Sequence, residues 1–322
     1  MWPTLEIHIE QIRTKGDAVT DLPLSQIGGD GVFVMEIERA LHERRIDLAV
    51  HSLKDLPTVQ PPGLRIVVAG PREDVRDVLV WNSSTLSQSP RYPRGVPQHI
   101  TAEDAPTSSD TPCGCQGASL HIGTCSLRRT AQIRALYPNA QILPLRGNVD
   151  TRIRKLEAGD YDSIVLASAG LHRLAMQERL AGRLTYLPIE LMMPAPGQGA
   201  LALEIRDEPE MRALLAPISD PISQATTSSE RMFMRRLGAG CYLPVAAYGE
   251  IANEALTLRG LVISLDGQHQ VRVSQSIPWT AETSIECAEQ LGVGLAEQAL
   301  SQGAAEIVSE LNANREQEPQ HA

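Results

Sequence analysis

Hydrophobic and polar positions in the N-terminal quarter of the chain follow two different periods. Residues 4–14 alternate at period two, which predicts a strand, whereas apolar positions three or four apart at 34–45 predict an amphipathic helix. Apolar runs at 47–52, 64–70 and 77–81 predict three further strands. Strands that alternate with a helix are typical of an α/β domain with a mostly parallel sheet.

A change of composition separates this domain from the next one. Residues 82–118 are rich in Ser, Pro, Thr, Gly and Asp and show no periodicity, which predicts a flexible insertion or linker. Beyond it, strands and helices are predicted to alternate, with strands at 119–124, 140–146 and 161–171 and helices at 127–138 and 148–160. Residues 119–190 are therefore predicted to form a second α/β domain.

The last part of the chain has two components. A Gly/Pro-rich loop and a strand within 191–215 are expected to cross back to the first domain, which then comprises residues 1–81 and 191–215. Residues 216–322 begin with a helix, continue with two strands and end with another helix, which indicates a smaller α+β domain. The sequence thus predicts an α/β protein of two similar domains with a smaller α+β domain at the C-terminus.

Charge and composition argue against a nucleic-acid-binding, membrane or metal-binding protein. The formal net charge is -10 and only 3% of residues are aromatic, whereas nucleic-acid surfaces need a basic field and stacking side chains. No run of 18 apolar residues and no signal-peptide pattern is present, so we expect a cytoplasmic protein that does not interact with membranes. The five cysteines are sparse and odd in number, so we expect reduced thiols, and Cys113 and Cys115 lack a second pair at zinc-ligand spacing, so we expect no metal site.

Arginine placement is the most informative chemical feature. Six arginines lie near predicted strand ends of the second domain, where ligands of open α/β sheets bind: Arg128, Arg129, Arg146, Arg152, Arg154 and Arg173. Guanidinium groups bind carboxylates in a bidentate manner, so the pattern indicates a ligand with several carboxylates, and ordinary surface arginines are the alternative for any one of them. The adjacent pair Arg128 and Arg129 favours a bound anion, because two positive charges at a helix start oppose the helix dipole.

Two shorter motifs contain candidate reactive side chains. His51, Lys54 and Asp55 directly follow a predicted strand, which places an acid and a base at the mouth of a site where proximity shifts their pKa values. A local ion pair at the strand end is the alternative. Cys241 lies in a glycine-flanked loop, so its thiol is a candidate nucleophile or attachment point, with an inert buried thiol as the alternative.

Six motifs in a fixed order resemble the porphobilinogen deaminase (hydroxymethylbilane synthase) family, and the resemblance extends from residue 1 to about residue 312. They are HSLKDLP, GTCSLRR, LRGNVDTR, ASAGLHRL, PAPGQGALALE and GAGCYLP. The resemblance implies three domains, the first two like periplasmic binding proteins. It also implies a transferase of porphyrin and heme biosynthesis that condenses four porphobilinogen molecules head to tail, releases ammonia and forms hydroxymethylbilane, a linear tetrapyrrole.

The same resemblance implies roles for individual residues. A dipyrromethane cofactor is expected on Cys241 through a thioether, and Asp55 is expected to be the catalytic carboxylate. Further residues are expected to hold the acetate and propionate groups of cofactor and substrate: Lys54, Ser126, Arg128, Arg129, Arg146, Arg152 and Arg173. Phe33 matches an aromatic residue that lines the site, and we expect a monomer whose partner is the small-molecule substrate.

The chain departs from the family pattern at its start. Family members open with a strand and a helix that carry an Arg-x-Ser-x-Leu-Ala-Leu-x-Gln type motif, and this chain begins where their second strand is expected. A truncated gene model is our preferred explanation, and we expect poor turnover from the chain as given. A catalytically impaired paralogue and a non-enzymatic anion-binding protein of the same architecture are the alternatives.

Overall fold

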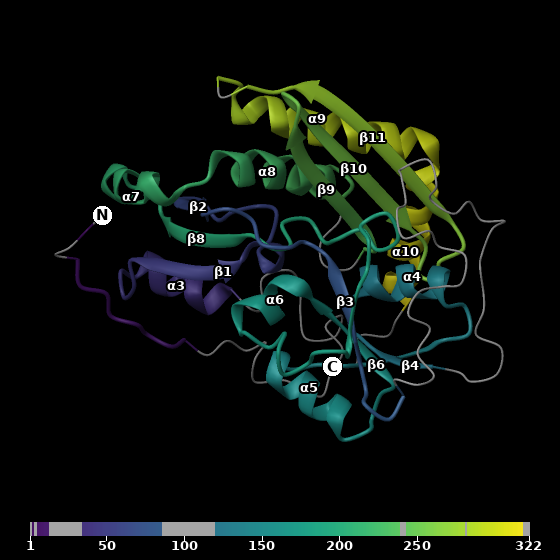
Figure 1. Ribbon diagram of the computed structural model, residues 1–322. Coiled ribbons are helices and arrows are strands. Elements are labelled where there is room, and N and C mark those ends of the chain that lie inside the picture. The colour runs from purple at the N-terminus through teal and green to yellow at the C-terminus, as the bar shows by residue number, and fades with distance from the viewer. Residues whose placement is uncertain are drawn as a thin grey trace.

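The computed structural model describes residues 2, 5–12, 34–85, 120–238, 243–280 and 282–317. In these residues, strands form three sheets, and each sheet packs against its own helices (Figure 1). The predicted fold class is confirmed, because two α/β units are followed by a smaller α+β unit.

The first sheet is built from distant parts of the chain. Its order is β1-β8-β2, with β1 at Leu48–Ser52, β2 at Leu64–Ala69 and β8 at Leu201–Arg206. Strand β8 returns to the first unit as expected, but it runs antiparallel to both neighbours, so the prediction of a mostly parallel sheet is wrong here. Helix α3 (Met35–His42) buries Leu41 against this sheet.

The predicted strand at 4–14 is not present in the part of it that the structure describes. Residues 5–12 contain no strand, and the side chains of Ile7 and Ile9 are 78% and 90% exposed. Alternation at period two predicts a strand only where a neighbouring strand pairs with it, and the described residues supply no such partner here.

The second sheet has the order β5-β4-β6-β3-β7. Its strands are β3 (Asp77–Trp81), β4 (His121–Gly123), β5 (Gln141–Leu143), β6 (Ser163–Ala167) and β7 (Leu184–Tyr186), and its helices are α4 (Leu127–Leu136), α5 (Val149–Glu157) and α6 (Ser168–Arg173). Strand β4 is parallel to β5 and β6, whereas β3 is antiparallel to β6 and β7. Strand β3, which the sequence placed in the first domain, therefore lies inside the second sheet. Most of the predicted linker, residues 86–118, lies outside the described residues.

The third unit is an antiparallel sheet of order β11-β10-β9. The strands are β9 (Val245–Ala252), β10 (Ala255–Ile263) and β11 (Gln270–Pro278), and the helices are α8 (Pro221–Arg236), α9 (Ile285–Ala299) and α10 (Ala305–Gln317). Helix α7 (Pro209–Leu215) instead buries Leu215 against the first sheet. Helices α8 and α9 pack against the sheet around Phe233 (Figure 1). They approach closely because Gly292 has no side chain, and a Cβ there would lie 2.2 Å from the Ser229 carbonyl oxygen.

Candidate active site

The turn after β1 presents Lys54 and Asp55. It is a short 3-10 helix, Leu53–Asp55, and the buried side chains of Leu53 and Leu56 anchor it in the core. Asp55 is exposed, and the Lys54 Nζ donates to Gln198 Oε1 at 3.3 Å. No ion pair joins Lys54 to Asp55 among the described residues, so the alternative of a local ion pair does not hold for these two. His51, the third residue of the motif, does form a buried pair, with Glu204 of β8 at 3.1 Å.

The surroundings of Lys54 lower its pKa. Burial lowers the pKa of Lys54 to about 8, and the nearby charge of Asp55 only partly offsets this effect. The positive charges of Arg129 and Arg128 lower the pKa further. An anion beside Lys54 would raise this pKa and stabilise the protonated form, so the side chain is suited to a ligand carboxylate.

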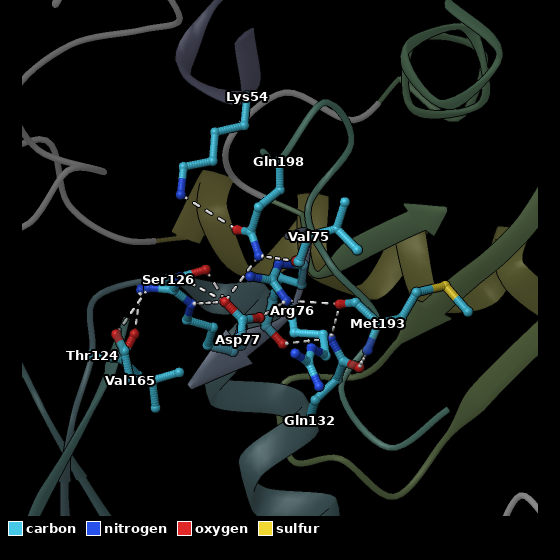
Figure 2. A network of polar contacts seen from close by, with 12 residues as sticks. Lys54, Val75, Arg76, Asp77, Thr124, Ser126, Gln132, Val165, Met193 and Gln198 are labelled. Carbon is cyan, nitrogen blue, oxygen red and sulfur yellow. Dashed lines mark hydrogen bonds and ion pairs between the residues drawn. The ribbon is translucent and has the colours of Figure 1, made fainter. Parts of the chain in front are cut away.

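Asp77, at the start of β3, is the centre of a buried polar network (Figure 2). Its carboxylate accepts from Arg128 Nη1 at 2.7 Å, from Arg129 Nη2 at 2.7 Å and Nε at 3.1 Å, and from Gln198 Nε2 at 3.1 Å. Gln198 in turn accepts from Lys54, which links the network to the turn after β1. All four donor groups converge on one fully buried carboxylate.

This network changes the meaning of the arginine pair at the start of α4. Burial raises the pKa of Asp77, but the charges of Arg128 and Arg129 outweigh burial and hold it well below its usual range. Asp77 therefore supplies the anion that the Arg128–Arg129 pair requires, and the pair alone does not imply a ligand. Asp77 and Gln198 were missed from the sequence, although a carboxylate that opens a fully buried strand must have a partner.

Helix α5 presents Arg152 toward the same site. Asn148 caps this helix by accepting from the Thr151 N–H at 2.9 Å, and Arg152 Nε donates to the Gly147 carbonyl at 2.7 Å. Burial lowers the pKa of Arg152, as do the charges of Arg129 and Arg146, whereas Asp55 raises it. Arg152 is therefore close enough to Asp55, Arg129 and Arg146 to interact electrostatically with each.

The two exposed arginines have different surroundings. Arg154 is exposed and donates to Thr151 Oγ1 at 3.0 Å, which agrees with the alternative of an ordinary surface arginine. Arg173, at the end of α6, is exposed and donates to the Gly199 carbonyl at 2.8 Å, so it contacts the loop that carries Gln198. Ser126 caps α4 by accepting from the Arg129 N–H at 3.4 Å.

The arrangement has the charge that a polycarboxylate requires. Five cationic side chains gather around the two carboxylates of Asp55 and Asp77: Lys54, Arg128, Arg129, Arg146 and Arg152. Because burial disfavours the protonated forms of Lys54 and Arg152, added negative charge would stabilise the site. These residues fit a cofactor that carries several carboxylates. Phe33 and Cys241 lie outside the described residues, so the structure does not test these two predictions.

Comparison with known proteins identifies the family. Residues 3–213 match the family model for the porphobilinogen deaminase dipyromethane cofactor binding domain, and residues 225–301 match the model for the porphobilinogen deaminase C-terminal domain. The porphobilinogen deaminase of Syntrophobacter fumaroxidans is 39% identical over 97% of this chain and 90% of its own. That of Chromobacterium violaceum is 41% identical over 96% of this chain and 89% of its own.

Similarity to solved structures is weaker. The periplasmic VFT2 domain of Bordetella pertussis BvgS is 14% identical, covers 56% of this chain and 64% of its own, and gives a TM-score of 0.31. A likeness at this level supports no conclusion about function, so the assignment depends on the two family models and the full-length relatives. The chain belongs to the porphobilinogen deaminase family, whose members are transferases of tetrapyrrole biosynthesis that carry a dipyrromethane cofactor.

Proposed function

We propose that this chain condenses four porphobilinogen molecules head to tail into hydroxymethylbilane, with release of ammonia, and that Asp55 is its catalytic carboxylate. The observation that carries this proposal is an exposed carboxylate beside a group of partly buried cations. The cations supply binding sites for the acetate and propionate groups of the substrate, and Asp55 supplies the negative charge that a developing cation needs.

The loss of ammonia defines what Asp55 does. When ammonia leaves porphobilinogen, positive charge develops on the substrate and is shared with its pyrrole nitrogen. Asp55 accepts a hydrogen bond from that N–H and stabilises the charge, because its turn is held rigidly by Leu53 and Leu56. Lys54 beside it binds a substrate carboxylate and leaves Asp55 unpaired for the reaction.

The carboxylate-binding residues divide into two groups. Lys54, Arg146, Arg152 and Arg173 contact ligand carboxylates directly in this proposal, with Ser126 beside them. Arg128 and Arg129 also belong to the binding set, but they donate five hydrogen bonds within the protein, to Asp77 and to the Met193 and Val165 carbonyls. Their contribution to ligand binding is therefore a positive field, and their contribution to the fold is the Asp77 network.

The cofactor is proposed to be attached to Cys241. When bound, dipyrromethane supplies the primer to which substrate units are joined. Helix α8 ends at Arg236, and Gly238 follows with φ of +67°, so the chain turns sharply just before the loop that contains Cys241. Phe33 is proposed to line the site near the growing product.

An intact-mass measurement tests the attachment site. The purified chain is expected to carry the mass of one dipyrromethane, and Cys241→Ser is expected to lack it. Cys287→Ser is the matched control, because Cys287 is an exposed free thiol in the third unit and should leave the adduct in place. An adduct that survives in Cys241→Ser would place the cofactor elsewhere, and a chain that never carries an adduct would favour a non-enzymatic anion-binding protein.

A kinetic measurement tests the role of Asp55. Asp55→Asn is expected to keep its folding and its cofactor while kcat falls by about 10²–10³, the usual loss when one electrostatic group is removed from an active site. Asp207→Asn is the control, since Asp207 is exposed and pairs with the surface residues Arg65 and Arg212. A kcat for Asp55→Asn within twofold of the unmodified chain would rule out the proposed role.

The chain is further proposed to act as a monomer in the cytoplasm. No helix among the described residues is long and apolar enough to cross a membrane. The cations placed near Asp55 all come from one chain, which supports a site within a single subunit. Sedimentation of the purified holoprotein at micromolar concentration should give a single species near 35.0 kDa.

A further inference from the structure

A cavity lies between residues of the two matched domains, and none of its lining residues belongs to the group of cations around Asp55. Its volume is about 160 Å³, and it lies between the segment around Glu190 and Met193 and one face of the β9–β11 sheet. Tyr248, Arg259, Arg272 and Ser274 line the sheet side. Met193 lies in the segment before β8, so the cavity has the C-terminal unit on one side and the rest of the protein on the other.

The two arginines of the cavity differ in their partners. Arg259 donates from Nη1 to Glu190 Oε1 at 3.1 Å, also pairs with Glu250, and has its guanidinium carbon 5.6 Å from the centre of the Tyr248 ring. Arg272 donates from Nε to Gln270 Oε1 at 3.3 Å, and no carboxylate of the described residues lies within ion-pair distance of it. Arg272 is therefore a guanidinium at a cavity wall with its Nη groups available.

The surroundings of Arg272 disfavour its charge. Burial lowers the pKa of Arg272, and the charge of Glu190 offsets this effect only in part. Glu190 is itself neutralised by Arg259. A planar carboxylate from outside the protein would give Arg272 two parallel hydrogen bonds and a counter-ion, which no described side chain provides.

The rest of the cavity is apolar. Ile189, Met193 and Val273 form much of its wall. A cavity of roughly 150 Å³ with apolar walls is large enough for benzene, so this one has room for a single small ring or a compact branched chain. Shape and charge together specify a ligand of about ten heavy atoms with one carboxylate at one end.

We propose that this cavity binds a small organic carboxylate with an aromatic or compact apolar body, held by Arg272 through its carboxylate and by Met193 and Ile189 through its body. This binding site is additional to the proposed active site. It adjoins the Asp77 network, because the Met193 carbonyl accepts from Arg128 Nη1 at 2.7 Å and from Gln132 Nε2 at 3.0 Å.

The test uses 4-fluorobenzoate as the probe and fluorine NMR titration of the full-length holoprotein as the readout. Arg272→Met removes the guanidinium and keeps an apolar stem, so the dissociation constant should rise by about tenfold or more, as expected for loss of a charge-assisted contact. Arg212→Met is the matched control, because Arg212 lies on the surface of α7 and pairs with Asp207. It should bind the probe as the unmodified chain does.

Two further measurements keep the proposal open to refutation. Ile189→Trp leaves Arg272 in place and fills the cavity, so it should also abolish binding. The neutral analogue 4-fluorobenzamide should bind at least tenfold more weakly than the acid. Equal binding of acid and amide, or unchanged binding in both the Arg272→Met and Ile189→Trp variants, would overturn the proposal. Loss of binding in Arg152→Met but not in Arg272→Met would also overturn it, because the probe would then occupy the active site.

Discussion

Replacement of Asp77 by Asn tests whether the buried network holds the second unit together. The change keeps the shape of the side chain and removes the charge that compensates Arg128 and Arg129, each of which is 5% exposed. Asp77 accepts four hydrogen bonds, three of them from these two guanidinium groups. The variant leaves two positive charges buried side by side without a counter-ion.

The expected loss of stability follows from burial. Removal of one partner from a buried ion pair costs about 3–5 kcal/mol of unfolding free energy. In a cooperative unit of 150–250 residues, each kcal/mol lowers Tm by about 2–4 °C, so the variant should melt roughly 6–20 °C lower. The loss is greatest near neutral pH. Because the pKa of Asp77 is lowered in the folded protein, its stabilisation is present above about pH 4 and disappears as pH falls further.

The matched control is Asp47→Asn, measured by circular dichroism during heating under the same conditions. Asp47 pairs with Arg206 Nη2 at 2.7 Å, the same distance as Asp77 to Arg129 Nη2, but the Asp47 side chain is 79% exposed. Asp47 is open to solvent, and the buried Arg206 keeps the Leu41 and Ile46 carbonyls and Glu208 as partners when Asp47 is neutralised. The loss should therefore be about 0–1 kcal/mol, and this variant should melt within a few degrees of the unmodified chain. Equal melting temperatures for the two variants at pH 7 would refute the reasoning from burial.

Three further outcomes are expected. Binding of a carboxylate ligand to the apoprotein should weaken as pH rises above about 8, because Lys54 then loses its proton. Titration calorimetry at several pH values checks this, and Lys54→Gln should abolish that part of the pH dependence. Gly199→Ala should lower the melting temperature more than Gly182→Ala, as measured by thermal melts of both variants. The backbone φ is positive at both positions, but only at Gly199 would a new Cβ lie 2.4 Å from a carbonyl oxygen. Arg152→Ala should raise KM by tenfold or more while Arg154→Ala changes it less than twofold, and similar KM values for the two would contradict the placement of the site on α5.

Sequence periodicity predicted the helices and strands that depend on local pattern. The apolar spacing at 34–45 located α3, and the run at 47–52 located β1. Strand direction was not predictable in the same way, because β8 comes from a distant part of the chain and inserts between β1 and β2. Pairing depends on which strands meet in space, and the alternation of elements along the chain carries little of that information.

The candidate site was predictable only in part. Lys54 and Arg152 were predicted to bind ligand from their residue types and their positions after predicted strands, and the structure brings both near Asp55. Asp77 was missed, because its partners Arg128 and Arg129 are 51 and 52 residues away in the sequence. The charge of the arginine pair was visible from the sequence, whereas the internal anion that compensates it was not.

The central position of β8 in the first sheet has a consequence for synthesis of the chain. Strands β1 and β2 leave the ribosome early, yet the strand with which both pair in the described part of the chain, β8, follows about 130 residues later. At 5–20 residues per second, the two strands wait on the order of ten seconds with open edges. The second sheet closes with β7 before β8 is made, so the growing chain folds its middle before its beginning. A released fragment that ends at residue 195 should therefore resist proteolysis at 120–187 and be cut readily at 48–69.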